Sequence, residues 1–228
     1  MMINLLWGDP PPPTRGPKPA MSLDAIAKAA IAVADRDGLD AVSMQRVAGE
    51  LSFTKMALYR YVPGKAELVS LMTDLAMGVP PHHPRQHWRK ALMAWALDLY
   101  AAFEKHPWVL LSTVGRRALG PNELTWTECG VRALTDTGLN GGQQLDSVMT
   151  IVGHVRTVAQ QSLTMPGGTT GATEKDITSA MIEVLNTQAE RFPGLAAALQ
   201  SMDGSESQGL IFGLERILDG LEVLIKRG

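Results

Sequence analysis

Three consecutive stretches near the start of the chain each begin with a helix-capping residue and continue with apolar residues at helical spacing. The capping residues are Ser22, Ser43 and Thr54, whose side-chain oxygens can accept hydrogen bonds from the free amides at a helix start. Gly38 closes the first stretch, where helices commonly end in a left-handed residue. This punctuation predicts short helices joined by tight turns, and it constrains the fold more than any other feature of the sequence.

The second and third stretches predict a helix-turn-helix. Residues 43–51 carry one apolar stripe, and a short turn leads to a brief helix over residues 55–61. In that helix the spacing turns Leu58 and Val62 inward. The outward positions are Lys55, Met56, Tyr59 and Arg60. A helix with such an outward face has the width and polarity to lie in the major groove of DNA.

The rest of the chain also predicts helices, and no stretch shows the alternation of a strand. The expected helices cover residues 22–38, 43–51, 55–61, 65–78, 86–105, 109–119, 122–137, 144–163, 174–191 and 206–226. We therefore expect an all-α fold with an N-terminal three-helix helix-turn-helix domain and a larger helical domain. The expected boundaries are 21–78 and 85–228, after an extended, basic and proline-rich arm over residues 1–20.

Charge and cysteine content narrow the class of protein. Residues 43–65 hold four basic and one acidic side chain, a net charge of +3, although the whole chain carries −2. A local basic segment fits contact with phosphates, although a solvated face with a chance surplus of charge fits equally well. The single cysteine excludes an internal disulfide, and no apolar run approaches the roughly 20 residues of a membrane span. We expect a cytoplasmic protein that has no membrane partner.

Three segments resemble the DNA-binding domain of tetracycline-repressor (TetR) type regulators. These are VSMQRVAGEL at residues 42–51, ALYRYV at 57–62 and GKAEL at 64–68. The likeness is dense over residues 22–77. It continues more weakly through the remaining chain, where the spacing of the helices is similar to that of the family's helical ligand-binding and dimerisation domain. It implies a sequence-specific transcriptional regulator, a repressor that a small hydrophobic ligand releases from a palindromic operator of double-stranded DNA.

The resemblance implies a role for individual residues. Gln45, Lys55, Met56 and Ala57 match positions that face bases, and a lysine can donate to guanine O6 or N7. The phosphate-facing positions are Ser43, Tyr59, Tyr61 and Lys65. The plainer alternatives are an ordinary exposed side chain for Lys55 and Arg60, surface filler for Met56 and packing on the first helix for Tyr59. Ser43 is an N-cap in any case, and a phosphate contact is an addition to that role.

One residue departs from the family pattern, and two residues before the first helix can extend the DNA contact. Ser52 stands in the turn where the family commonly has glycine, and serine adopts a left-handed conformation less readily. Arg15 and Lys18 precede the first helix and can enter the minor groove as an arm, or belong to a disordered tail.

The last predicted helix favours self-association. Its leucines and isoleucine recur at alternating spacings of four and three, as in a two-helix seam. The family resemblance implies a homodimer built from this helix and the one over residues 144–163. The expected interface residues are Val148, Val152, Val155, Leu210, Leu214, Ile217, Leu221 and Leu224. A central helix of a monomer is the alternative.

The effector site is the least determined feature. Aromatic, methionine and histidine side chains at helical spacing line a pocket or simply fill the core. The candidates are Trp95, Phe103, Trp108, Trp126, Met149, His154 and Met165. No metal-ligand spacing is convincing, so we expect no metal and no cofactor.

Two rival functions remain. An enzyme is disfavoured because the sequence has no glycine-rich phosphate loop, no Gly-x-Ser-x-Gly elbow and no His-Glu-x-x-His pair. The alternative is a helical small-molecule-binding protein that no longer binds DNA, against which the intact caps and turn argue.

Overall fold

The structure of the 228-residue chain is a computed structural model that describes residues 2–8, 21–84, 86–115, 117–162, 174–201 and 209–227. The regular elements among these residues are all helices, so the expected all-α class is confirmed. No helix in this described part is both long enough and apolar enough to cross a membrane.

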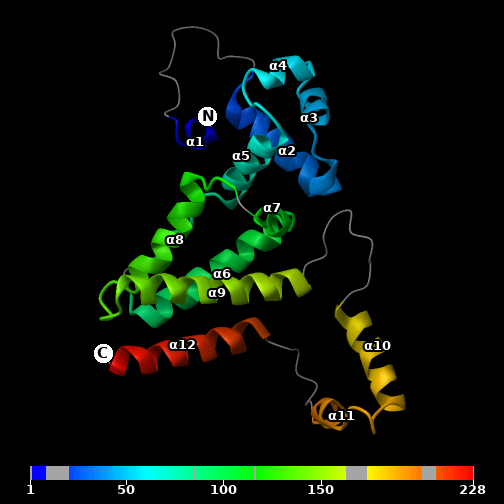
Figure 1. Cartoon of the computed structure of the whole chain (residues 1–228), viewed down its shortest axis with the longest axis vertical. Coiled ribbons are helices and arrows are strands. Elements are labelled where there is room, and N and C mark those ends of the chain that lie inside the picture. Colours follow the sequence, from blue (N-terminus) through cyan, green and yellow to red (C-terminus); the bar gives the residue numbers. More distant parts are fainter. Residues whose placement is uncertain are drawn as a thin grey trace.

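Four α-helices and one short 3-10 turn form what we call the N-terminal helical region. They are α2 (Leu23–Asp37), η1 (Leu39–Ala41), α3 (Met44–Glu50), α4 (Lys55–Tyr59) and α5 (Lys65–Met77). Helix α2 packs along α5, while α3 packs against α2 and α4 (Figure 1). The side chains of Ile26, Val47, Leu58 and Leu68 have no exposed surface and form the centre of this region.

The three predicted caps are all present. Ser22 Oγ accepts a hydrogen bond from the Ala25 amide at 3.1 Å. Ser43 Oγ and Thr54 Oγ1 each accept one at 3.2 Å, from the amides three residues further along the chain. Each cap satisfies a helix-start amide that has no partner within its own helix, which fixes where α2, α3 and α4 begin.

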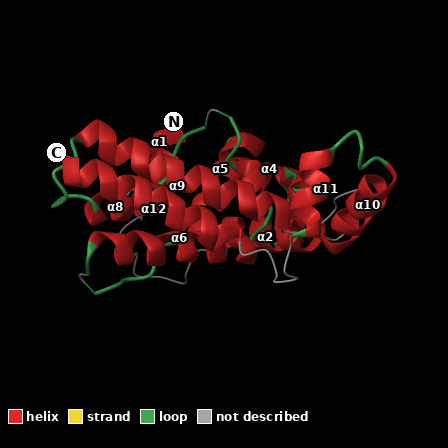
Figure 2. Cartoon of the chain, turned by 90° about the horizontal axis from the view of Figure 1, so that it is seen from below, coloured by secondary structure: helices red, strands yellow, loops and turns green. Residues whose placement is uncertain are grey.

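The remaining helices form what we call the helical body. Its main helices are α6 (Trp88–Lys105), α7 (Val109–Ser112), α8 (Pro121–Ala133), α9 (Gly141–Ser162) and α12 (Gly209–Arg227). Helix α9 packs against α6 and α12, and α8 packs against α6 and α9 (Figures 1 and 2). Helices α10 (Glu174–Thr187) and α11 (Pro193–Gln200) pack on each other at one end of the body (Figure 2).

The first residues differ from the extended arm expected over residues 1–20. Helix α1 (Met2–Trp7) packs on α5, where Leu6 is buried, and Trp7 Nε1 donates to the Leu119 carbonyl at 3.0 Å. The prolines that justified an extended arm begin only at Pro10, so they do not prevent a helix before it. Residues 9–20, with Arg15 and Lys18, lie outside the described residues.

Two further helix predictions need correction. The helix expected over residues 109–119 ends at Ser112, and Gly115 then takes a positive φ of 86°, which turns the chain away. Helix α11 was not expected from the sequence. Its signal was Pro193 at the first helical position, followed by leucine and alanine residues that favour helices.

Candidate nucleic-acid interface

Helices α3 and α4 are joined by a turn that serine closes in a left-handed conformation. Ser52 has a φ of 60°, the position that the sequence comparison with the family assigned to glycine. The Phe53 amide donates to the Ala48 carbonyl at 2.9 Å across this turn. Such a closure satisfies carbonyls at the end of α3 and sets the angle at which α4 leaves.

Helix α4 presents an exposed face that makes few contacts with its own chain. Lys55, Met56, Tyr59 and Arg60 are all exposed, Met56 to 73%, whereas Leu58 has no exposed surface. The Lys55 ammonium lies 5.6 Å from the centre of the Tyr59 ring. Sequence periodicity therefore predicted the inward and outward faces of α4 correctly.

The other predicted DNA-facing residues within the described part of the chain are exposed, with one partial exception. Gln45, Tyr61 and Lys65 are exposed, while Ala57 is half-buried. Ser43 is also exposed, and its hydroxyl is engaged as the cap of α3.

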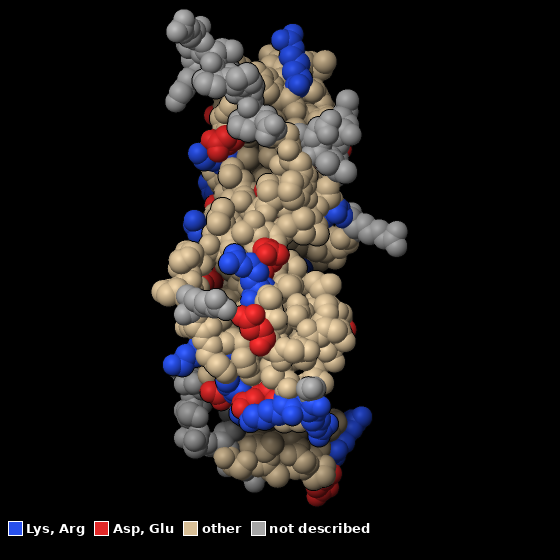
Figure 3. Space-filling model, turned by 90° about the vertical axis from the view of Figure 1, so that its left-hand side faces the viewer, with Lys and Arg blue, Asp and Glu red and all other residues tan. Residues whose placement is uncertain are grey.

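Basic side chains near this face divide into paired and unpaired groups. Arg36 donates to Glu50 at 2.6 Å, and Arg46 donates to Asp37 at 2.5 Å. Among the described residues, no carboxylate lies within ion-pairing distance of Lys55 or Lys65. These two lysines are thus available to an external anion, whereas the two arginines brace α2 and α3. Elsewhere, basic and acidic side chains lie beside one another along the body (Figure 3).

Polar side chains tie the N-terminal helical region to the body. Asp35 Oδ1 on α2 accepts a hydrogen bond from Trp108 Nε1 at 2.6 Å and lies 2.8 Å from His106 Nδ1. Trp108 and His106 are buried at the junction of α6 and α7. This group joins α2 directly to the end of α6.

A second tie runs from α5 to α8. Asp74 Oδ1 accepts a hydrogen bond from the Glu123 amide at 3.0 Å, and Asn122 Nδ2 donates to the Asp74 carbonyl at 3.0 Å. Asp74 is buried, and this burial raises the pKa of its carboxyl group above the ordinary value, although the hydrogen bond from the Glu123 amide acts in the opposite direction. Gly120 packs against the Asp74 side chain so closely that no larger residue fits there.

The predicted pocket residues do not line one cavity. Trp95, Phe103, Trp108 and Trp126 are buried in the core of the body, and their indole N–H groups, where present, are already bonded. Met149 is exposed on α9, and Met165 lies outside the described residues. His154 Nε2 lies 3.0 Å from the Leu210 carbonyl, a contact between α9 and α12.

The structure instead has a cavity of about 940 Å³ between residues 79–84 and 86–87, α6 and α8. Of the predicted pocket residues in the described part of the chain, only Trp95 lines it. Sequence reasoning treated the segment after Gly78 as a link between domains and so missed its role as a wall. The concentration of three prolines and two histidines over residues 79–84 was the signal that could have indicated it.

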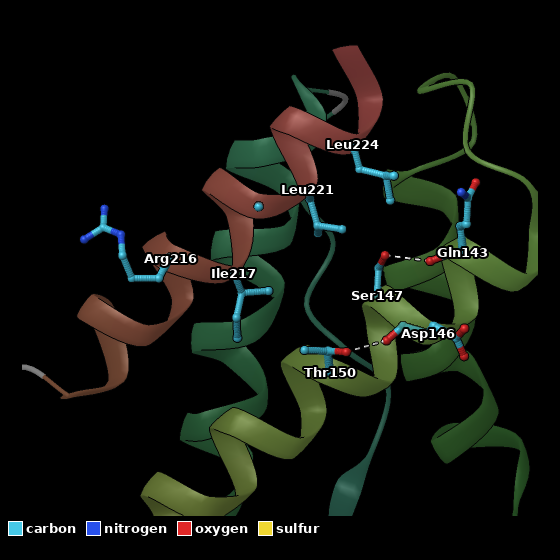
Figure 4. A pocket seen from close by; sticks show the side chains of 9 residues that line it. Gln143, Asp146, Ser147, Thr150, Arg216, Ile217, Leu221 and Leu224 are labelled. Atoms are coloured by element: carbon cyan, nitrogen blue, oxygen red, sulfur yellow. Dashed lines mark hydrogen bonds between the residues drawn. The ribbon is translucent and has the colours of Figure 1, made fainter. Parts of the chain in front are cut away.

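The predicted dimer residues separate into buried and outward groups. Val148, Val155 and Leu214 have no exposed surface, and Leu221 is 9% exposed, because these side chains pack within the chain. Val152, Leu210 and Ile217 are half-buried. Leu224 is exposed at a groove of about 380 Å³ between α9 and α12, beside Ile217 and Gly220 (Figure 4).

The buried members of the seam therefore need correction as partner contacts. The apolar spacing identified a buried row, but that row meets α9 of its own chain. The outward apolar side chains on the same two helices are Leu145, Met149, Phe212, Val223 and Leu224. The sequence singled out only Met149, as a pocket residue, and Leu224, as a residue of the seam.

Comparison with known proteins gives two adjoining family matches. The profile described as "Bacterial regulatory proteins, tetR family" matches residues 20–72. The profile "Tetracyclin repressor-like, C-terminal domain" matches residues 80–225. The chain is 36% identical over 231 aligned residues to the HTH-type transcriptional repressor DrrR1 of Streptomyces coeruleorubidus, covering 98% of this chain and 85% of that protein.

Solved structures share the fold. Apo ActR from Streptomyces coelicolor matches with a TM-score of 0.73 and 23% identity, over 92% of this chain and 99% of ActR. ActR of the same organism in complex with actinorhodin matches with a TM-score of 0.71 and 24% identity, over 88% of this chain and 95% of that chain.

Proposed function

This chain belongs to the TetR family of DNA-binding transcriptional regulators, and from that premise we propose that it is a repressor which binds a palindromic operator as a homodimer and is released by a small hydrophobic molecule. The family supplies the DNA-binding role. The operator symmetry, the dimer and the release are our proposal, and they build on the exposed face of α4, the observation that carries DNA contact.

The outward side chains of α4 have the chemistry to read DNA. Lys55 projects from the start of α4, has no acidic partner in the described residues, and can donate to guanine O6 or N7 in the major groove. Met56 and Gln45 flank it as further base-facing residues, with Ala57 offering at most its methyl group. Because Leu58 anchors the opposite side of α4, these residues can reach the groove without unfolding the helix.

Phosphate contacts come from side chains around this face. Tyr59 and Tyr61 offer exposed hydroxyls, and Lys65 lies at the amino end of α5, where free amides favour an anion. Ser43 can add its hydroxyl proton to a phosphate while its oxygen still caps α3. Arg15 and Lys18 are proposed as arm contacts on the basis of the sequence alone.

The outward apolar side chains of α9 and α12 support the homodimer. Leu145 and Met149 on α9 are each 49% exposed, and on α12 Leu224 is 39% exposed and Phe212 63% exposed. Large apolar side chains grouped at a surface commonly mark an interface. A two-fold dimer places two α4 helices about 34–36 Å apart, one turn of DNA, which requires a palindromic operator.

The repressor leaves its operator if a ligand favours a dimer in which the distance between the two α4 helices no longer matches one turn of DNA. The coupling free energy between two such sites is typically about 1–3 kcal/mol. The hydrogen bonds from Asp35 to α6 and α7, and from Asp74 to α8, are the contacts through which the body can shift the N-terminal helical region.

The DNA-binding proposal is tested with the DNA upstream of the protein's own gene. Fluorescence anisotropy should detect a salt-sensitive complex that unrelated DNA of equal length does not displace. Lys55→Ala should lose about 1–3 kcal/mol at one base position and relax selectivity there. Lys65→Ala should weaken all sequences alike and flatten the salt dependence. Identical behaviour of the two variants would refute this division of roles, and the absence of any selective complex would favour the alternative of a ligand-binding protein that no longer binds DNA.

The dimer is tested with substitutions on the outward side chains. We expect the double variant Phe212→Glu, Leu224→Glu to be monomeric by light scattering and to lose operator binding, because two buried charges oppose an apolar interface. The matched control is Ile182→Glu, Val184→Glu on α10, which changes two exposed apolar residues away from α9 and α12. A dimer that survives the first variant would place the interface elsewhere.

A further inference from the structure

The cavity between α6, α8 and the segment after α5 has the size of a small-molecule site. Its volume of about 940 Å³ lies within the range of roughly 300–1,000 Å³ that is usual for ligand pockets. We propose that this cavity is the effector site and that it takes a flat, polycyclic aromatic molecule bearing hydroxyl or carbonyl oxygens. The regulatory meaning of this site rests on the proposed function, whereas the binding itself does not.

The walls favour a flat ligand because indole and imidazole rings contribute to them. The nineteen lining residues include Trp88 and Trp95 from α6, together with three prolines and three histidines from the preceding segment. Trp95 Nε1 donates to the Trp126 carbonyl at 3.0 Å, so Trp95 can offer the cavity only its ring. Stacked aromatic rings gain more from offset contact with another ring system than from contact with aliphatic chains of equal area.

Branched aliphatic side chains are scarce in these walls. Val79 is the single valine, leucine or isoleucine among the lining residues. A site for a fatty acyl chain or another saturated ligand would need many such side chains to fill the irregular space around it. The smaller groove between α9 and α12 does have aliphatic walls, from Ile217, Leu221 and Leu224, and it lies on the face proposed for the dimer.

The polar groups that line the cavity, which also include the charged side chains of Arg132 and Asp136, suit an oxygen-rich ligand. Thr125, Thr135 and Thr137 line the cavity with hydroxyl groups, and His82 and His87 line it with imidazoles. Asp98 Oδ2 lies 2.5 Å from His83 Nε2, so this carboxylate is already paired across the cavity edge. Hydroxyl and imidazole groups both donate and accept hydrogen bonds, which matches phenols and carbonyls.

The cavity also borders both connections to the N-terminal helical region. Helix α6 carries Trp88 and Trp95 in the wall and ends at His106, whose ring contacts Asp35 on α2. On the other side, Trp126 Nε1 donates to the Gly78 carbonyl at 3.0 Å, directly before the segment that forms the outer wall. A ligand that displaces either wall therefore acts on an element joined to α2 or to α5.

The test uses Cys129, the only cysteine of the chain, as a reporter inside the cavity. Burial raises the pKa of the Cys129 thiol, so labelling with iodoacetamide is followed at mildly alkaline pH. The probes are alizarin, a flat dihydroxyanthraquinone, progesterone, a rigid saturated ring system, and palmitate, a flexible acyl chain. We expect alizarin to bind by calorimetry and to slow the labelling several-fold, and the other two to do neither.

Three variants distinguish binding of alizarin in the cavity from binding at other surfaces. Trp88→Ala removes a stacking wall and should weaken alizarin roughly two- to tenfold. The matched control Trp7→Ala removes an exposed indole outside the cavity and should leave alizarin affinity unchanged. Ala91→Trp fills the cavity from α6 and should abolish alizarin binding, with the far-ultraviolet circular dichroism spectrum checking that the helices remain folded.

Each outcome decides one question. Absence of alizarin binding, equal binding of progesterone or palmitate, or unchanged labelling of Cys129 would overturn the proposed site and ligand class. Alizarin that binds and protects Cys129 but leaves the operator complex intact in anisotropy supports the site and refutes release as the function of that ligand. If alizarin abolishes operator binding by the wild type but not by the Ala91→Trp variant, the result supports both the site and the release.

Discussion

The N-terminal helical region and the helical body are both made of amphipathic helices, but their polar side chains act over different distances. In the N-terminal region, Ser43 and Thr54 each bond an amide three residues away. In the body, Arg89 on α6 pairs with Asp219 on α12 at 2.5 Å. Arg156 on α9 donates to the carbonyl of Leu110 on α7. Local rules therefore specify where α3 and α4 of the first region begin, whereas these contacts of the body depend on neighbours that only the complete fold supplies.

This contrast bears on how the molecule transmits a signal. A region that is specified locally can move as a unit, and the contacts that move it must lie at its border. The bonds made by Asp35 and Asp74 are such contacts, because each joins a helix of the N-terminal region to the body. Substitutions within each region and at Asp35 and Asp74 test whether the two regions unfold as separate units and how strongly the contacts between them join them.

The largest expected effect is that of Leu58→Ala in the centre of the N-terminal region. Leu58 has no exposed surface, so truncation should destabilise that region by about 2–5 kcal/mol and abolish operator binding. All five tryptophans lie outside residues 21–78, but Trp7, Trp108 and Trp126 contact or bond to α5, Asp35 and Gly78, so only part of the fluorescence change, that of Trp88 and Trp95, reports on the body alone. We expect circular dichroism to detect unfolding of Leu58→Ala at lower urea concentration than tryptophan fluorescence does.

The matched variant for Leu58→Ala is Leu218→Ala in the body, which is equally buried. For that variant we expect tryptophan fluorescence to change at least as early as circular dichroism. Coincident transitions in both variants would mean that the border contacts make the chain one cooperative unit, and the contrast between the regions would fail.

The second effect is that of Asp35→Ala at the border. Its removal leaves the Trp108 indole N–H, which is buried, without its acceptor, at a free-energy cost of about 1–3 kcal/mol. We expect a lower unfolding midpoint by tryptophan fluorescence and an altered operator affinity, because α2 loses its tie to α6.

Asp35→Asn serves as the control because its amide keeps an oxygen acceptor at Oδ1. We expect this variant to retain most of the stability and of the operator affinity. If the asparagine variant falls as far as the alanine variant, the charge of Asp35 rather than its hydrogen bond to Trp108 holds the border.

The same difference in distance decides what could be predicted from the sequence. The three caps and the inward Leu58 follow from residues within a few positions of one another, whereas Ser52 keeps the left-handed φ of 60° at which the sequence predicted a reshaped turn. Periodicity also found that Leu214 and Leu221 share a face of α12. It could not tell whether that face meets α9 of the same chain or a second copy, because apolar spacing carries no information about the neighbour.

The cavity was missed for a related reason. Residues 79–84 have no periodic pattern, so they predict only an irregular segment. They form a wall because α5 and α6, the helices on either side of them, both pack against α8. No local pattern in the sequence indicates this packing. Trp95 was predicted as a pocket residue and does line the cavity, but Phe103 and Trp108, chosen by the same spacing argument, are ordinary core residues.

The third effect is that of Asp74→Asn, and it depends on pH. Burial raises the pKa of Asp74 in the folded protein, so the folded state holds its proton more tightly than the unfolded state does. This aspartate therefore contributes less to stability as pH rises through about 4, where ordinary aspartates ionise, and up through its own raised pKa. Asparagine can accept the Glu123 hydrogen bond without this loss.

We expect Asp74→Asn to stabilise the protein at pH 7 by the order of 1 kcal/mol, or roughly 2–4 °C in Tm. The difference from the wild type should shrink as the pH is lowered toward acid, where Asp74 is protonated in both states. A variant that is less stable at pH 7 would show that the charge on Asp74, placed at the amino end of α8, is worth more than its burial costs.

The smallest effect is that of Ser52→Gly in the turn between α3 and α4. Serine at a φ of 60° carries a steric strain of roughly 1–2 kcal/mol that glycine lacks, and glycine loses roughly 0.4–1 kcal/mol more chain entropy on folding. We expect a net gain of less than about 1 kcal/mol in urea unfolding, followed by circular dichroism. Ser52→Val, which is bulkier at the same φ, should lose stability instead. If glycine destabilises the turn, the serine hydroxyl makes a contribution beyond backbone conformation, and local rules would not suffice even in the region that they describe best.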